Sequence, residues 1–319
     1  MKRLTLPFAT LLLLLLAPIP AKASKGTVTV SANHTVYFAG HALEELRTLA
    51  LDAGHNPDDN YWGDLDDSTA SLPGVYVDLA GFGNLLSVSA SGLWGKQPNS
   101  DNWTGPEGKG ASDANISHAR YGVFGISLLD APKQLLVGVF VFDAPPDPEA
   151  TPSEAPPIRD IDDLITTPAL NQAFGIGASL ENIVVPDGAT RLCFGMHDGR
   201  EWSNNGGSVE VTVTTIAEIE IKPETLNLKS KGLFTAFIDL PEGCDEQDID
   251  INTVVCEGAP AVSGVMADNN KLIVKFNRED LVDVLPGDAV GLTVTGELSN
   301  GAHFTGSDTI RVISKGGKK

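Results

Sequence analysis

Apolar and polar residues alternate in short runs along most of the chain, with the period of two that is typical of β-strands. Gly, Pro, Asn and Asp separate these runs, and helical patterns rarely interrupt them, which favours antiparallel sandwiches over alternating strands and helices. This pattern predicts an all-β protein. Up to residue 216 the predicted strands are 27–30, 75–79, 85–90, 121–129, 135–142, 183–185, 191–196 and 208–216.

A few segments depart from the strand pattern. Leucines recur at helical spacing within residues 41–50, and Gly54 is a typical stop signal, so one helix is expected there. Short helical turns are expected at 161–165 and 279–285. Residues 143–157 contain six prolines, which cannot donate ladder hydrogen bonds, so we expect an exposed and extended loop.

The first residues have the pattern of a secretory signal peptide. Lys2 and Arg3 precede a leucine-rich run at 11–16, and Ala21-Lys22-Ala23 fits a cleavage site. No later apolar run approaches the roughly 20 residues that a spanning helix needs. We therefore expect a secreted protein, extracellular or periplasmic, with no membrane span.

A second set of strand patterns begins after residue 216, at 219–221, 232–240, 271–276, 290–295 and 308–313. The length that remains after the signal peptide exceeds what one sandwich usually needs, so two domains are expected. The predicted organisation is a signal peptide at 1–23, a first β-sandwich at 24–216, a second at 217–314 and a basic tail at 315–319.

The charge of the chain narrows the classes of partner. The formal net charge is −20, and loss of the three basic residues of the signal peptide takes it to about −23. An acidic surface repels phosphate backbones, which argues against nucleic acid, and it suits hard cations. The histidines show no metal-ligand spacing, and no G-x-S-x-G motif occurs. We therefore expect no catalytic residues and no enzyme activity.

Three cysteines are too few for a disulfide scaffold, so the core must be hydrophobic. Cys244 and Cys256 lie close in sequence, and in an oxidising compartment we expect them to pair. Cys193 lies in an apolar strand and is expected to be a buried free thiol.

The stretch MHDGREWSNNGGSVEVTV, residues 196–213, groups polar residues between two predicted strands. One interpretation is a hairpin turn, because Asn-Gly is a strong hairpin signal. That leaves Asp198 and Asn204 unexplained. The alternative is a calcium loop, because Ca²⁺ takes carboxylate, amide and backbone oxygens, and Asp198, Asn204 and Asn205 supply three side-chain groups.

A shared ion places a condition on the backbone. Consecutive side chains of a regular strand point to opposite faces, so Asn204 and Asn205 need an irregular backbone, which Gly206 and Gly207 can provide. Backbone carbonyls, one of them from Glu201, would complete the set. Because few of the ligands carry a negative charge, we expect weak calcium binding, with a Kd of roughly 10⁻⁵ to 10⁻³ M.

Residues 184–213, and less closely 89–95 and 103–108, resemble bacterial calcium-dependent galactophilic lectins. In that family an Asp and an Asn-Asn pair supply calcium ligands, and sugar hydroxyls take open positions on the ion. The resemblance implies that Asp198, Asn204 and Asn205 are ligands and that a backbone carbonyl near Trp94 completes the site. The family's sugar-contacting His and Gln have no counterpart here, so galactose specificity does not carry over.

Residues 219–232, 295–301 and 305–312 resemble an accessory Ig-like β-sandwich module of bacterial and archaeal surface proteins. The fold class expected is therefore two β-sandwiches, the first jelly-roll or galactose-binding-like and the second Ig-like. The second module implies architecture and no chemistry.

Two hypotheses for function follow. The first is a secreted, calcium-dependent carbohydrate-binding protein in which Asp198 and Asn205 contact sugar hydroxyls and His197 contacts the ligand. Trp202 would then stack on the sugar, or it packs the loop onto the sandwich. The alternative is a structural or adhesive extracellular protein whose calcium only braces a loop. The acidic stretch 58–67 is a solvated loop or a second ion site.

Overall fold

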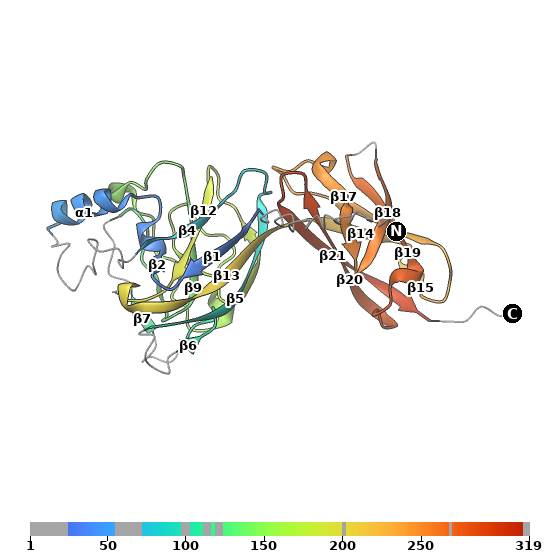
Figure 1. Cartoon of the computed structure of the whole chain (residues 1–319), viewed down its shortest axis with the longest axis horizontal. Helices are drawn as coiled ribbons and strands as arrows, with labels where there is room; N and C mark the ends of the chain where they lie inside the picture. Colours follow the sequence, from blue (N-terminus) through green and yellow to red (C-terminus); the bar gives the residue numbers. More distant parts are fainter. Residues whose placement is uncertain are drawn as a thin grey trace, which may run out of the picture.

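The computed structural model describes residues 25–54, 72–96, 103–110, 116–118, 124–199, 202–267 and 270–314. The predicted signal peptide, the acidic stretch 58–67, Glu201 and the basic tail lie outside the described residues. The chain forms two β-rich lobes side by side, a first lobe of residues 25–216 and a second lobe of residues 218–314 (Figure 1). The all-β fold class is confirmed.

The elements of the first lobe are strands in the main, with one α-helix and four 3-10 turns among the described residues. They are β1 (Thr27–Ser31), β2 (His34–Thr35), η1 (Val36–Phe38), α1 (Leu43–Asp52), β3 (Leu72–Pro73), β4 (Val75–Asp78), β5 (Leu85–Lys96), β6 (Trp103–Thr104), β7 (Ile116–His118), β8 (Asp130–Pro132), β9 (Leu136–Val141), η2 (Pro148–Ala150), η3 (Ile161–Asp163), β10 (Phe174–Gly175), β11 (Ser179–Val184), β12 (Arg191–Met196), η4 (Trp202–Asn204) and β13 (Asn205–Ile216).

The second lobe contains strands and two short 3-10 turns in its described part. They are β14 (Glu218–Lys222), β15 (Thr225–Asn227), β16 (Leu233–Asp239), η5 (Glu246–Asp248), β17 (Ile249–Cys256), β18 (Ala259–Met266), β19 (Leu272–Asn277), η6 (Arg278–Asp280), β20 (Gly287–Leu298) and β21 (His303–Ile313).

The first lobe is a sandwich of two sheets. One sheet has the order β10-β9-β12-β4, and the facing sheet contains β11, β5, β13 and β1, all antiparallel. Alternate residues of β13, among them Val209, Val211 and Val213, are buried against Phe140 and Phe194 of the opposite sheet. Period-two burial is the expected result when one face of a strand meets the core.

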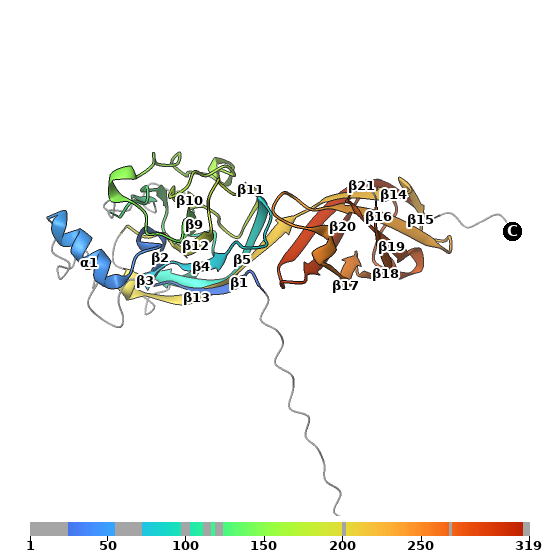
Figure 2. The same cartoon turned by 90° about the horizontal axis from the view of Figure 1, so that it is seen from above.

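The four-stranded sheet is covered on its second face as well. Every residue of β9 is buried, and Val137 and Val139 belong to a separate core with Phe38, Phe124 and the Leu46 side of α1. Helix α1 lies at the far end of the first lobe from the second lobe (Figure 2). The predicted helix at 41–50 is therefore confirmed as α1, and Gly54 follows its C-cap with a positive φ of 79°.

The strands of the second lobe are hydrogen-bonded in the order β21-β20-β17-β18-β19-β16-β14. Phe234 and Phe276 stack at 5.2 Å in its core. The lobes are joined by β13, whose last residues pair in parallel with β21 at Ile216 and Thr305. Only Ala217 separates β13 from β14. The Ig-like character of this lobe and the domain ranges stay predictions.

The strand predictions require correction in two respects. The predicted strand at 121–129 is not a strand over the described residues 124–129. Gly125 has a φ of 77°, the backbone N–H of Ser127 donates to the carbonyl of Asn171, and the hydroxyl of Ser127 accepts from the N–H of Ala173. Its apolar residues are buried as coil. The pattern also missed β17 and β18, and β18 has no clear alternation because most of it is exposed.

The predicted disulfide between Cys244 and Cys256 is wrong in this structure, where all three cysteines are free. Cys256 ends the eight-residue strand β17. Cys244 precedes that strand and lies near the carbonyl of Gly81 at 3.9 Å. Cys244 thus lies beside the turn at Asn300, which contacts the same carbonyl, whereas Cys256 is paired with Val294 further back along β20.

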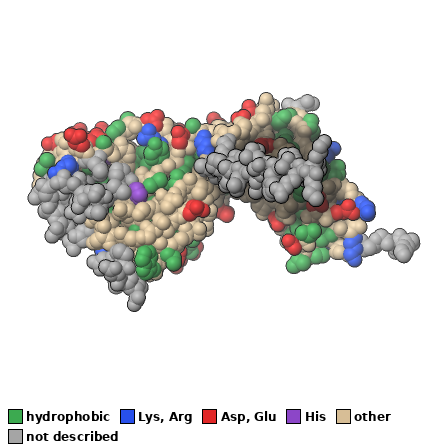
Figure 3. All heavy atoms as spheres, viewed as in Figure 1, with side chains coloured by type: hydrophobic (Ala, Val, Ile, Leu, Met, Phe, Trp, Pro, Cys, Tyr) green, Lys and Arg blue, Asp and Glu red, His purple; other side chains and the backbone are tan. Residues whose placement is uncertain are grey.

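Acidic side chains are visible at the surface of both lobes (Figure 3). Among the helices that the structure describes, none has the length and apolar character needed to cross a membrane.

Candidate functional site

The segment between β12 and β13 crosses from one sheet of the first lobe to the other. Strand β12 pairs with β9 and β4, whereas β13 pairs with β5 and β1. The hairpin interpretation of Asn205-Gly206 is therefore wrong. The crossing places Asp198 at the end of one sheet and Asn205 at the start of the other.

Asp198 is 1% exposed although it is charged. Its Oδ1 accepts a hydrogen bond from the backbone N–H of Gly199 at 2.7 Å and lies 3.3 Å from Lys96 Nζ. Its Oδ2 is buried and accepts no hydrogen bond from any residue that the structure describes. A buried carboxylate oxygen without a donor is costly, so this atom is a candidate metal ligand.

Asn204 and Asn205 lie on an irregular backbone, as the shared-ion hypothesis requires. The 3-10 turn η4 ends at Asn204, and β13 begins at Asn205. The Nδ2 of Asn205 donates to the carbonyl of Ala32 at 3.3 Å. Its Oδ1 is buried and accepts no hydrogen bond within the described part of the chain, and Asn204 Oδ1 is buried beside it in sequence.

Gly207 supplies the special backbone conformation, with a φ of 86°. A Cβ at this position would lie 2.5 Å from the carbonyl oxygen of Leu93 and against the ring of Trp103. Glycine therefore permits both the turn out of η4 and the close approach of β5. Gly206 does not share this conformation.

The expected backbone ligand near Trp94 stays a prediction, and the strand register shows which residues of β5 lie beside the site. Trp94 lies opposite Gly207, and Lys96 lies directly opposite Asn205. The indole of Trp94 is fully buried and donates to the carbonyl of Gln134 at 2.8 Å. The main chain next to Asn205 is thus that of Lys96. Glu201, the other expected carbonyl donor, lies outside the described residues.

Trp202 and His197 are buried packing residues, which corrects their assignment to a ligand surface. Both are 0% exposed. The indole N–H of Trp202 donates to the carbonyl of Met196 at 2.5 Å, and its ring lies 5.9 Å from that of Tyr37. Of the two roles left open for Trp202, the structure gives the packing role.

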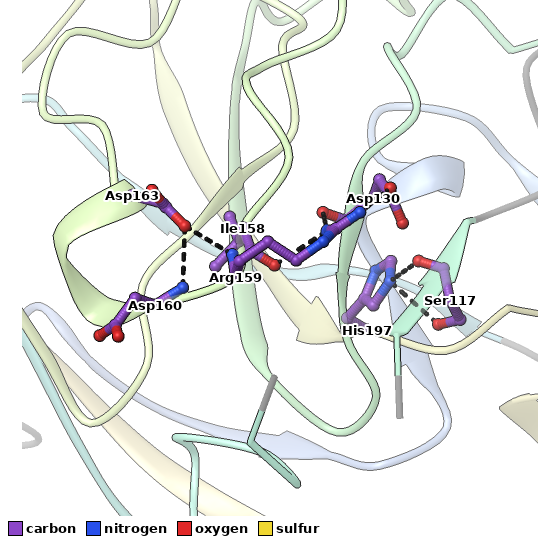
Figure 4. Close-up of polar contacts among 7 residues, drawn as sticks. All are labelled: Ser117, Asp130, Ile158, Arg159, Asp160, Asp163 and His197. Atoms are coloured by element: carbon purple, nitrogen blue, oxygen red, sulfur yellow. Dashed lines mark hydrogen bonds and ion pairs between the residues drawn. The ribbon is translucent and has the colours of Figure 1, made fainter. Parts of the chain in front are cut away.

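His197 is held from both sides of its ring. Its Nδ1 lies 3.2 Å from the hydroxyl of Tyr37. Its Nε2 lies 2.9 Å from the carbonyl of Ser117, as Figure 4 shows. Burial raises the pKa of Tyr37, so that hydroxyl stays protonated. These bonds fix the start of the loop that carries Asp198.

Trp103, to which the sequence assigned no ligand role, is 43% exposed and lies next to Gly207. It is paired with Gly95 in the β5–β6 ladder, and Gly95 is paired with Gly206. Two glycines in a row beside one tryptophan would have indicated the exposed ring of Trp103. This row can be recognised only when the strand register is known.

The side chains fit a hard cation better than a transition metal. No group of three or more His, Cys, Asp or Glu side chains gathers as a metal site in the described ranges. Asp198, Asn204 and Asn205 instead offer one carboxylate and two amides, the oxygen donors that Ca²⁺ accepts. The buried, unbonded oxygens of Asp198 and Asn205 agree with this chemistry.

A separate cleft of about 260 Å³ lies on the first lobe, lined by Glu107, Gly110, Pro132, Leu135, Ile158, Arg159, Asp160, Ile161, Leu164 and Gly177. The guanidinium of Arg159 pairs with Asp130 at 2.6 Å, and Asp163 accepts from the backbone of Arg159 and Asp160 (Figure 4). These backbone bonds lower the pKa of Asp163. The one basic side chain of the cleft lining, Arg159, is thus paired with an acidic residue of the same lobe.

No protein-family model matches the chain, and no curated protein matches it. A solved structure that resembles it is the "EclA N-terminal domain; PllA-like lectin", with 13% sequence identity and a TM-score of 0.25 over 59% of this chain and 93% of that domain. A TM-score of this size establishes neither a shared fold nor a shared ligand.

Proposed function

We propose that the protein is a secreted, calcium-binding protein whose first lobe binds carbohydrate through the ion. Asp198, Asn204 and Asn205 would hold the calcium, and a bound calcium ion supplies open positions for vicinal sugar hydroxyls. The observation that carries this proposal is the pair of buried oxygens, Asp198 Oδ2 and Asn205 Oδ1, that accept no hydrogen bond in the described structure.

Side chains near the ion would contact the sugar directly. The carboxylate of Asp198 would accept hydrogen bonds from the same hydroxyls, and the amide of Asn205 would accept or donate them, which fixes the spacing of the hydroxyls. Trp103 replaces Trp202 as the aromatic candidate for a sugar face, because its ring is exposed and lies against Gly207.

A second candidate is a protein in which calcium braces the loop and binds no sugar. The burial of His197 and Trp202 favours it, because both side chains flanking the loop bond within the fold. In that case protein oxygens and water would fill the positions on the ion.

A glycan array separates the two candidates. The mature protein is applied in calcium and in chelator, beside Asp198→Ala and Asn205→Ala, with Asp239→Ala in the second lobe as the matched control. Asp239 is also paired with a lysine, at 2.9 Å. Calcium-dependent glycans bound by wild type and Asp239→Ala, and lost in both site variants, support the lectin function. Calcium stabilisation without any bound glycan rejects it and leaves the bracing role.

A further inference from the structure

Lys96 stands where a cation would be expected. Its Nζ lies 3.3 Å from Asp198 Oδ1, and its backbone lies opposite Asn205 in the β5–β13 ladder. Directly opposite residues of an antiparallel pair have Cα atoms about 4.5 to 5.5 Å apart. The ammonium group therefore contacts one proposed calcium ligand, Asp198, from a strand position opposite another, Asn205.

We propose that the ammonium of Lys96 is a built-in competitor of calcium, which must leave Asp198 before the ion binds. This inference rests on the proposed calcium site. It assigns Lys96 the role of setting the calcium affinity of that site.

Charge is the first argument. Asp198 is the single acidic side chain in the proposed ligand set, and the other two ligands are neutral amides. With Lys96 in contact, the charge of the set falls from −1 to zero. Because calcium affinity follows the charge of the ligands, and because two cations repel each other at this distance, occupancy by Lys96 must weaken calcium binding.

Incomplete hydrogen bonding is the second argument. Lys96 contacts Oδ1 of Asp198, which already accepts the N–H of Gly199 at 2.7 Å, and leaves Oδ2 without a hydrogen bond. Asn205 Oδ1 is left in the same condition. One ammonium group thus neutralises the carboxylate but leaves Asp198 Oδ2 and Asn205 Oδ1 without a bonding partner. A cation with six or more ligands can bind all of these oxygens.

Lys96 also has a path to leave. Its side chain is 29% exposed, while that of Asp198 is 2% exposed. A lysine side chain has a flexible stem of four carbons, so the ammonium group can move to solvent without a change in the backbone of the strand. Between calcium-binding events the ammonium keeps a buried carboxylate neutralised, which lets the loop stay folded without the metal.

The test is a calcium titration of the mature protein by calorimetry and by thermal melting. Lys96→Met removes the charge and keeps most of the stem, and it introduces no oxygen that could itself bind calcium. Lys271→Met is the matched control, because Lys271 pairs with Asp239 at 2.9 Å with a similar side-chain exposure of 27%. We expect Lys96→Met to tighten the calcium Kd at least about tenfold and to lower the melting temperature in chelator, with the control unchanged.

Each outcome decides a different point. Equal calcium Kd values in wild type and Lys96→Met overturn the competitor role and leave the calcium site intact. A weaker Kd in Lys96→Met overturns it as well. Absence of calcium binding in both proteins overturns the proposed function itself. A variant that is unfolded in chelator and folds on addition of calcium supports the inference, and Lys96→Leu, which likewise adds no oxygen, then gives a second measurement of the Kd.

Discussion

The amide of Asn205 is oriented by Ala32. A backbone carbonyl can only accept, so the hydrogen bond of 3.3 Å from Asn205 Nδ2 to Ala32 O fixes the nitrogen toward β1 and turns Oδ1 away from it. That oxygen is buried and accepts no hydrogen bond in the described part of the structure. A contact between the turn after β1 and the first residue of β13 thus prepares one ligand for a cation.

Calcium should stabilise the protein, because an ion that binds the folded state adds RT ln(1 + [Ca²⁺]/Kd) to the free energy of unfolding. At a calcium concentration of 100 times Kd the gain is about 2.7 kcal/mol. Differential scanning calorimetry should show a calcium-dependent rise in Tm for wild type and for Asp239→Ala, and none for Asp198→Ala. An equal rise in Asp198→Ala would place the ion elsewhere.

Asn205→Asp should tighten calcium binding about tenfold, since it adds a second carboxylate to a set with one. In chelator the same change should lower Tm, because two buried carboxylates then share one lysine. Isothermal titration measures the Kd. Asn84→Asp, at an exposed position, is the control. A Kd that is unchanged in Asn205→Asp would contradict the assignment of Asn205 as a ligand.

Gly207→Ala should destabilise the first lobe by more than about 1 kcal/mol, because a side chain is strained at a φ of 86° and its Cβ would lie 2.5 Å from the Leu93 carbonyl. Gly291→Ala is the matched change, since Gly291 lies in β20 with no atom within 4 Å of the added Cβ. Urea unfolding compares the two. Similar costs would mean that the backbone at Gly207 is not constrained as described.

Trp202→Phe should lower stability by about 1 kcal/mol through loss of the indole bond to Met196, and it should leave the calcium response unchanged. Trp103→Ala should have only a small effect on stability, but it should abolish glycan binding. Thermal melting and the glycan array report the two properties separately. Loss of glycan binding with full stability in Trp202→Phe would restore Trp202 as a ligand residue.

Stability should fall as pH rises from 9 to 12. Burial raises the pKa of Cys193 and of Cys256 to about 12, from an ordinary value of 9.0. In this window the unfolded chain loses the thiol protons and the folded chain keeps them, so the free energy of unfolding decreases by at most about 1.4 kcal/mol per pH unit for each thiol. Urea unfolding at several pH values should show a shallower decline in Cys193→Ala. An identical decline would mean that Cys193 does not contribute.

Local patterns in the sequence determined much of the fold. The alternation at 191–196 and 208–216 predicted β12 and most of β13, and helical spacing at 41–50 predicted α1. The three polar side chains of the candidate site could also be selected, because the oxygen chemistry that calcium requires is a property of residue type. The hydrophobic periodicity of a strand or helix and the donor atoms of a side chain can both be recognised within a few residues of sequence.

Tertiary structure alone decided how those residues are used. Lys96 reaches Asp198 across 102 positions of sequence, and Trp103 becomes the exposed tryptophan while Trp202 is buried. Whether β12 and β13 pair or lie in different sheets depends on their partners β9 and β5, which no local pattern specifies. Such contacts follow from strand register and from the packing of two sheets, because burial is a property of the whole sandwich and not of any single segment.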